Sequence, residues 1–150
     1  PYFRTDLAVA VGRDADWNKL DFKTGLTPKV VVGVLKRSTG EEWARKNLKS
    51  IRKTYTSPDR LVRALNNREV AIILIDRPIL GWILARRHYK FKIVEEGIDH
   101  QDYAIAVAKN NGKLRDRLNQ ALEELDRKDI YDRIYKKWYE KMQDLPPIGR

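Results

Sequence analysis

Polar side chains that could hold a small charged ligand follow two apolar segments of the sequence. Ser38 and Thr39 come shortly after the segment that ends at Leu35. A helix predicted to begin here would add free backbone N–H groups and the positive end of its dipole, which together bind anions. Asp76 follows the second apolar segment and could bind a cation. The two sets of groups suit the two charges of a zwitterion, such as the α-carboxylate and α-ammonium of an amino acid.

Both positions also have an ordinary structural interpretation. Thr39, with Glu42 three residues later, has the pattern of a helix N-cap with its capping box. Asp76 precedes Arg77 and Pro78, and Asp is a common N-cap before a helix that opens with Pro. For either residue alone, capping is the commoner role. The binding hypothesis therefore depends on their joint position at strand ends.

The sequence lacks the residue patterns that are typical of catalysis or of metal binding. The chain has no cysteine, and its histidines, His88 and His100, lack the spacing of a metal pair. Adjacent acidic residues such as Glu123 and Glu124 are typical of solvated surfaces rather than of acid–base pairs. No Walker loop, Gly-x-Ser-x-Gly elbow or dinucleotide fingerprint is present. We therefore expect no catalytic residue, no metal and no cofactor.

The two strand ends belong to a regular alternation of strands and helices. Continuous apolar segments at 30–35 and 70–75 predict strands buried on both faces, as in parallel sheets. Helices are predicted to begin at Thr39, at Pro58 after a Ser57 cap, and at Pro78. Ligands of open α/β sheets bind beyond the carboxyl ends of the strands. The remaining predicted strands lie at 7–11, 53–55, 91–94 and 103–108.

The last third of the chain predicts two amphipathic helices, because apolar residues recur there at helical spacing. The expected fold class is thus α/β, with a mostly parallel sheet flanked by helices and two C-terminal helices. The apolar positions of the two C-terminal helices are Leu114, Leu118, Leu122 and Leu125, followed by Ile130, Ile134, Trp138 and Met142.

Composition narrows the choice of partners. The 150 residues suit one domain or two small lobes, and the formal net charge is +10. Opposite charges are interleaved along the chain, so we expect no nucleic-acid partner. A basic interaction domain stays as a rival interpretation, and its binding to polyanions would fall steeply with salt.

The longest apolar segments are far shorter than the roughly 20 residues that cross a membrane. Absence of cysteine fits both the cytoplasm and a bacterial extracytoplasmic space.

Four segments of the sequence, taken in order, carry a family resemblance. They are Val32-Gly33-Val34-Leu35-Lys36-Arg37-Ser38-Thr39-Gly40-Glu41-Glu42, Ile73-Leu74-Ile75-Asp76-Arg77-Pro78, Tyr103-Ala104-Ile105-Ala106-Val107-Ala108-Lys109 and Tyr131-Asp132-Arg133-Ile134-Tyr135-Lys136-Lys137-Trp138. Together they resemble the family 3 extracellular solute-binding proteins, which deliver polar amino acids to ABC importers. The resemblance covers residues 1 to 142. It implies a periplasmic-binding-protein-like (type II) fold, in which two α/β lobes joined by two crossing strands close on the ligand.

The resemblance also implies a domain organisation. It is expected to comprise a first crossing strand at 1–11, the second lobe at 12–102, a return crossing strand at 103–109, C-terminal helices of the first lobe at 110–142 and a tail at 143–150.

The same resemblance assigns the ligand-binding residues. Thr39 would bind the α-carboxylate, with Ser38 beside it and Leu35 touching the ligand, and Asp76 would bind the α-ammonium. The implied partners are a small polar amino acid and an ABC transporter permease. The implied location is periplasmic or extracellular, with membrane association through the transporter.

Two departures from the family pattern stand out. Arg37 occupies a position where the family usually has Gly, and this would crowd the loop or add a contact to an acidic ligand. The part of the first lobe that precedes the first crossing strand, with its aromatic clamp and its carboxylate-binding arginine, has no counterpart in the sequence. The C-terminal helices would then expose apolar surface, which predicts a homodimer through these helices or their docking on the remaining sheet.

Two alternatives share the expected fold. One is a ligand-sensing module of a signalling protein. The other is a dehydratase-like enzyme, which would need an acid positioned in the cleft, and no residue of the sequence singles itself out for that role.

Overall fold

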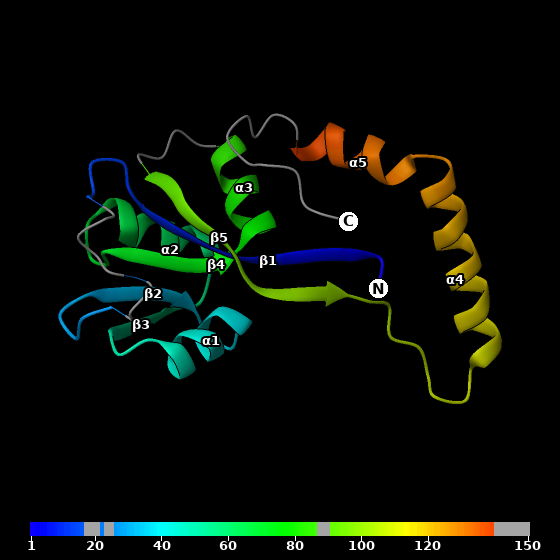
Figure 1. The fold of residues 1–150 in the computed structure, drawn as a ribbon, viewed down its shortest axis with the longest axis horizontal. Helices are drawn as coiled ribbons and strands as arrows, with labels where there is room; N and C mark the ends of the chain where they lie inside the picture. Colours follow the sequence, from blue (N-terminus) through cyan, green and yellow to red (C-terminus); the bar gives the residue numbers. More distant parts are fainter. Residues whose placement is uncertain (17–21, 23–25, 87–90, 140–150) are drawn as a thin grey trace. The chain divides into compact units, whose positions relative to one another are not determined.

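The structure, a computed structural model, describes residues 1–16, 22, 26–86 and 91–139 (Figure 1). It forms two compact units. The central unit is Asp6–His100, and the terminal unit joins Pro1–Thr5 to the chain from Gln101 onward. The elements in chain order are β1 (Phe3–Gly12), β2 (Val31–Leu35), α1 (Thr39–Asn47), β3 (Ile51–Tyr55), α2 (Pro58–Asn66), β4 (Ile72–Asp76), α3 (Arg77–Arg86), β5 (Phe91–Tyr103), α4 (Gly112–Arg127) and α5 (Ile130–Tyr139).

The five strands form one sheet in the order β3-β2-β4-β1-β5. β2 pairs in parallel with both β3 and β4, whereas β1 pairs antiparallel with β4. The predicted α/β class, with helices flanking the sheet and two helices at the C-terminus, is confirmed. The sheet itself is mixed, because the N-terminal strand enters it beside β4 in the opposite direction.

Two apolar clusters cover the two faces of the sheet in the central unit. Alternate strand residues point to opposite faces, so β1 and β4 each contribute buried residues to both clusters. The α1-side cluster contains Leu7, Val9, Val11, Leu26, Val32, Val34, Ala44, Leu48, Ile72 and Leu74. The α2-side cluster contains Ala8, Ala10, Leu61, Val62, Ala64, Leu65, Val70, Ile73, Ile75, Leu80, Ile83 and Phe91. Both apolar segments that predicted doubly buried strands therefore lie between the two clusters.

The predicted start of α2, at Pro58 after a Ser57 cap, is confirmed. Ser57 is the N-cap, and its hydroxyl oxygen accepts a hydrogen bond from the Arg60 N–H at 3.3 Å. Pro58 occupies the first turn, where a missing N–H costs nothing.

The strand predicted at 103–108 is wrong. β5 is a single long strand that ends at Tyr103, and residues 104–108 have no regular secondary structure. The polar residues before Tyr103 pair with β1 mainly through the backbone and through charge: the Tyr2 N–H donates to the Tyr103 carbonyl at 2.8 Å, and Arg4 binds Asp102 at 2.8 Å. Ile105, which made the segment look strand-like, is 50% exposed.

The Arg4–Asp102 ion pair also shifts two ionisation equilibria. The hydrogen bond from Arg4 holds the pKa of the Asp102 carboxyl below its usual value, and the same contact raises the pKa of Arg4. A carboxyl whose pKa is lower in the folded protein than in the unfolded chain stabilises the fold at pH values above its unfolded-state pKa. The contribution of Asp102 to stability is therefore lost as the pH falls through its folded-state pKa.

Both C-terminal helices are confirmed. Asn111 is the N-cap of α4, because its side-chain oxygen accepts from the Leu114 N–H at 3.2 Å. α4 contacts α5 but contains no buried residue. Leu114 and Ile134 remain 43% and 49% exposed. Met142 lies outside the described residues. No helix among the described residues is long and apolar enough to cross a membrane.

Gly33, in the middle of β2, is closely packed against the α2 side of the sheet. A Cβ added to Gly33 would lie 2.7 Å from Cδ1 of Leu61. We expect Gly33→Ala to lower the free energy of unfolding by about 1–3 kcal/mol through overpacking, as measured by urea denaturation. In a Leu61→Ala background, which removes the clashing atom, the same change should cost clearly less. Equal costs in the two backgrounds would contradict this account of the contact.

Candidate functional site

The carboxyl ends of β2 and β4 meet at one edge of the sheet. The two strands run parallel, with Val34 opposite Leu74. β2 ends one residue later at Leu35, and β4 ends two residues later at Asp76. Neighbouring strands lie about 4.8 Å apart, so the loops that follow them begin side by side.

Asp76 belongs to the α1 side of the sheet. Along β4, Ile72 and Leu74 are members of the α1-side cluster, and Asp76 follows with the same two-residue period. Its partner across the antiparallel ladder is Leu7, another member of that cluster. The Asp76 side chain is nearly buried, at 9% exposure. A carboxylate is therefore held at the sheet edge on the face that α1 covers.

The first turn of α1 is seated against the end of β4. A Cβ added to Gly40, which is buried, would lie 3.1 Å from the carbonyl oxygen of Leu74. Only a glycine allows this approach without a shift of the backbone. Since Leu74 is two residues from Asp76, the amino end of α1 and the carboxylate lie at the same edge and on the same face. The two predicted strand ends are thus neighbours, whereas contact of Thr39 and Asp76 with one ligand stays a prediction.

The prediction that Thr39 is the N-cap of α1 is wrong. Ser38 is the N-cap, and its Oγ accepts from the Glu41 N–H at 3.1 Å. The Glu41 carboxylate accepts in turn from the Arg37 N–H. The capping pair is thus displaced by one residue from the predicted pair of Thr39 and Glu42. Thr39 is the first residue of the helix and is exposed, so its hydroxyl is not needed to cap the helix.

The other two predicted site residues, Ser38 and Leu35, are placed less favourably for contact with a ligand. The Ser38 hydroxyl donates to the Leu35 carbonyl at 2.8 Å while it caps α1, so both of its roles are internal. Leu35 packs against the α2-side cluster, on the face opposite Asp76. Contact of Ser38 and Leu35 with a ligand stays a prediction, as does ligand contact of Thr39 and Asp76.

Gly40 is a site residue that the sequence analysis missed. The first N–H groups of a helix have no acceptor within the helix, which makes those of Thr39 and Gly40 the natural donors to an anion. The glycine after the Ser-Thr pair was visible in the sequence. Its close contact with β4, however, depends on tertiary packing.

Charged and titratable groups surround this edge. Glu42, in the first turn of α1, binds Lys46 at 2.8 Å, and this hydrogen bond lowers the pKa of the Glu42 carboxyl. Tyr55 ends β3 at the same edge, and its carbonyl accepts from the Lys36 N–H at 2.9 Å. Burial, with a smaller effect of Glu69, raises the pKa of the Tyr55 hydroxyl. Among the described residues, no cluster of three His, Asp or Glu side chains could hold a metal ion.

The comparison with protein families decides where this fold belongs. The family model of the bacterial extracellular solute-binding proteins, family 3, matches residues 1–141. The chain belongs to this family. The predicted resemblance is confirmed, and with it the periplasmic-binding-protein-like fold.

Solved structures of similar proteins agree with the family assignment. An ancestral arginine-binding protein bound to glutamine is 30% identical, with a TM-score of 0.71 over 93% of this chain and 61% of the other. The arginine-bound amino acid ABC transporter substrate-binding protein AbpA of Streptococcus pneumoniae is 16% identical, with a TM-score of 0.75 over 95% and 60%. The ancestral amino acid-binding protein AncCDT-1, a precursor of cyclohexadienyl dehydratase, is 20% identical, with a TM-score of 0.77 over 93% and 59%. The chain therefore spans about three fifths of these solute-binding proteins.

Arg37 adopts a backbone conformation that favours glycine. Its φ of 59° lies in the left-handed region, which explains why a Gly is expected at this position of the family. A side chain with a Cβ is strained there by about 1–2 kcal/mol. The Arg37 side chain is exposed, so it does not disturb the packing of the core.

Replacement of Arg37 tests this strain. We expect Arg37→Gly to raise the free energy of unfolding by about 0.5–1 kcal/mol, because glycine adopts a positive φ without strain. The matched control is Lys36→Gly, at an exposed neighbour whose φ is not positive, which should lower stability by a similar amount through the freer unfolded chain. Urea denaturation of the three proteins measures both effects. Loss of stability in both variants would contradict the strain at Arg37.

Proposed function

We propose that this chain provides the second-lobe half of an amino acid site in an extracytoplasmic solute-binding protein. The observation that carries the proposal is the joint position of the α1 amino end and Asp76, on one face of one sheet edge. Family membership supports amino acid binding in general. The two poles of this edge support a zwitterionic ligand, and the preference for a polar amino acid rests on the family alone.

The amino end of α1 binds the α-carboxylate of the ligand. The Thr39 hydroxyl and the N–H groups of Thr39 and Gly40 are the donors, and the helix dipole adds a positive potential. Ser38 holds this helix start in place as its N-cap rather than as a ligand contact. Leu35, whose side chain packs against the opposite face of the sheet, is not among the proposed ligand contacts.

Asp76 binds the α-ammonium group. Asp76 occupies the last position of β4 and is only 9% exposed, so its carboxylate has little room to move before the ligand arrives. A preorganised ion pair in a partly buried site gives a strong, charge-assisted hydrogen bond. Removal of the charge therefore affects affinity more than removal of the Thr39 hydroxyl.

The wider role is delivery of a polar amino acid to an ABC transporter permease from the periplasmic or extracellular side. The support is the family, together with solved neighbours that are described as arginine-binding and as transporter substrate-binding proteins. Closure on the ligand requires a complementary lobe, and the proposal assigns that lobe to the part of the neighbours that this chain does not span.

Calorimetric titration with arginine, lysine, glutamine and glutamate tests the two poles of the site. We expect Asp76→Asn to weaken binding of the preferred amino acid on the order of tenfold to a hundredfold, because one charge-assisted hydrogen bond is lost. Thr39→Val should weaken it less, by about twofold to tenfold, because the backbone N–H groups of residues 39 and 40 still donate to the carboxylate. Asp99→Asn, at an exposed carboxylate outside the site, is the matched control and should bind as the unmodified chain does.

Ligand analogues separate binding from folding. An analogue without the α-amino group should bind equally weakly to the unmodified chain and to Asp76→Asn, because the partner of Asp76 is missing in both cases. If Asp76→Asn is folded by circular dichroism and binds the complete amino acid with unchanged affinity, the proposed ammonium site is wrong.

A dehydratase is the second candidate, because one structural neighbour is described as a precursor of cyclohexadienyl dehydratase. The likeness at 20% identity extends to the fold alone. We favour a non-enzymatic role, since Asp76 serves as a fixed anion in the proposed site rather than as an acid. Turnover of a cyclohexadienyl substrate by this chain, lost in Asp76→Asn, would support the enzyme instead.

A further inference from the structure

β3 is an outer strand of the sheet in the part of the chain that the structure describes, and β2 pairs with its inner side (Figure 1). The chain continues into the terminal unit through β1 and β5, and β5 is the strand at the opposite edge of the sheet. The outer edge at β3 therefore belongs to the central unit alone. The first four residues of β3, 51–54, are all exposed.

Two hydrogen bonds establish which way the backbone groups of β3 point. The Ile51 N–H donates to the Val30 carbonyl at 3.1 Å, and the Tyr55 carbonyl accepts from the Lys36 N–H at 2.9 Å. Both bonds lead toward β2. Backbone groups alternate in direction along a strand, so the odd-numbered residues of β3 face β2 and the even-numbered residues face away from the sheet.

Arg52 and Thr54 thus turn their backbone N–H and carbonyl groups outward, where an added strand can pair with them. Their side chains lie on the α1 side of the sheet, because Val32, which is opposite Arg52, belongs to the α1-side cluster. Ile51, on the α2 side, is 54% exposed. An added strand would therefore meet a cation on one face and an apolar side chain on the other.

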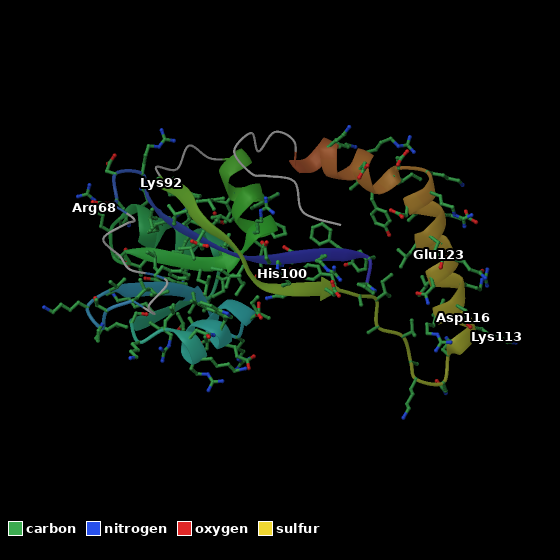
Figure 2. The ribbon with its side chains drawn as sticks, viewed as in Figure 1. Arg68, Lys92, His100, Lys113, Asp116 and Glu123 are labelled. Atoms are coloured by element: carbon green, nitrogen blue, oxygen red, sulfur yellow. The ribbon has the colours of Figure 1, made fainter. Side chains whose placement is uncertain are left out.

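Basic residues surround β3. The segment 45–68 contains the end of α1, all of β3 and α2, and it has eight basic residues against one acidic residue, Asp59. This surplus of seven is most of the net charge of +10, so the interleaving of opposite charges along the chain does not extend to this segment. All eight basic residues are exposed. They are Arg45, Lys46, Lys49, Arg52, Lys53, Arg60, Arg63 and Arg68, the last of which is labelled in Figure 2.

The two cations of β3 keep their charge available to a partner. The Arg52 guanidinium donates to the Leu48 carbonyl at 3.4 Å, and the Lys53 ammonium donates to the Glu69 carbonyl at 3.3 Å. Both acceptors are neutral backbone groups, so these bonds hold the side chains beside the edge without cancelling their charge. The other N–H groups of each cation suit a carboxylate.

We propose that β3 binds an extended, acidic peptide segment of a partner protein, which pairs with it as an additional strand of the sheet. A second copy of β3 does not fit, because pairing would bring like charges together. A lipid surface would match the charge but would not pair with the outward backbone groups. An acidic strand does both, with carboxylates beside Arg52 and Lys53 and an apolar side chain beside Ile51. This interaction does not depend on the proposed amino acid site.

Fluorescence anisotropy with a labelled peptide tests the charge and the backbone pairing. The probe is a blocked peptide of alternating glutamate and valine, longer than the five residues of β3. It should bind saturably to the 150-residue chain, and on the order of tenfold more weakly to Arg52→Glu with Lys53→Glu, because repulsion replaces two exposed ion pairs. The same peptide with methylated backbone nitrogens keeps its charge but has no N–H donors. It should bind on the order of tenfold to a hundredfold more weakly.

Thr54→Pro tests the edge from the side of the protein. The Thr54 N–H points outward, so proline removes no hydrogen bond to β2, and edge strands tolerate proline at such positions. Affinity for the acidic peptide should fall on the order of tenfold, because a donor is lost and the proline ring occupies the edge. Thr54→Val, which keeps the N–H, is the matched control and should bind as the unmodified chain does.

Amide hydrogen exchange, followed by nuclear magnetic resonance, locates the added strand. In the chain without peptide, the N–H groups of Arg52 and Thr54 should exchange fast, whereas that of Lys53, which bonds to β2, should exchange slowly. Saturation with the acidic peptide should slow exchange at Arg52 and Thr54 by about tenfold or more and leave Lys53 unchanged.

Four results would overturn the proposal. The first is slow exchange of Arg52 and Thr54 without peptide, which would mean that the chain itself covers the edge. The second is equal affinity for the methylated and unmethylated peptides. The third is unchanged affinity of Thr54→Pro for the acidic peptide although the variant is folded by circular dichroism. The fourth is displacement of the peptide by phosphatidylglycerol vesicles that bind Thr54→Pro as tightly as the unmodified chain, which would assign this surface to a membrane.

Discussion

The parallel pairing of β2 with β4 is the constraint on which the candidate site depends. It brings two carboxyl ends to one edge of the sheet, and the two-residue period of β4 then sets Asp76 on the face that α1 covers. The close approach of Gly40 to the Leu74 carbonyl fixes the amino end of α1 beside it. Were β4 to run the other way, Asp76 would lie at the opposite edge, and the helix start would have no carboxylate for a neighbour.

Local and periodic signals predicted most of this arrangement. The apolar segments of β2 and β4 are continuous because both of their faces are covered, and the Ser57-Pro58 pair marks a helix start through chemistry that needs no tertiary contact. β5 was only half predicted. Its second half is polar and is held by backbone pairing and by Arg4 with Asp102, and hydrophobic patterning carries no trace of either interaction.

The details of the site could not be predicted from the sequence, because they depend on backbone geometry and tertiary packing rather than on residue patterns. Ser38 and Thr39 are both good caps, and which of them caps α1 depends on how the loop leaves Leu35. Assignment of Leu35 to the side opposite Asp76 follows from strand phase, which the residue types alone do not set. The positive φ of Arg37 likewise needs the backbone, although the departure from a family glycine pointed to that position.

The central claim is that Thr39, Gly40 and Asp76 contact the same ligand molecule. Nuclear magnetic resonance titration of the isotope-labelled chain with the standard amino acids measures this directly. The account predicts that one polar amino acid shifts the amide signals of Thr39 and Gly40 and the side-chain carboxyl signal of Asp76 along one saturation curve. Saturable shifts confined to other parts of the chain, with these three residues unmoved, would contradict it.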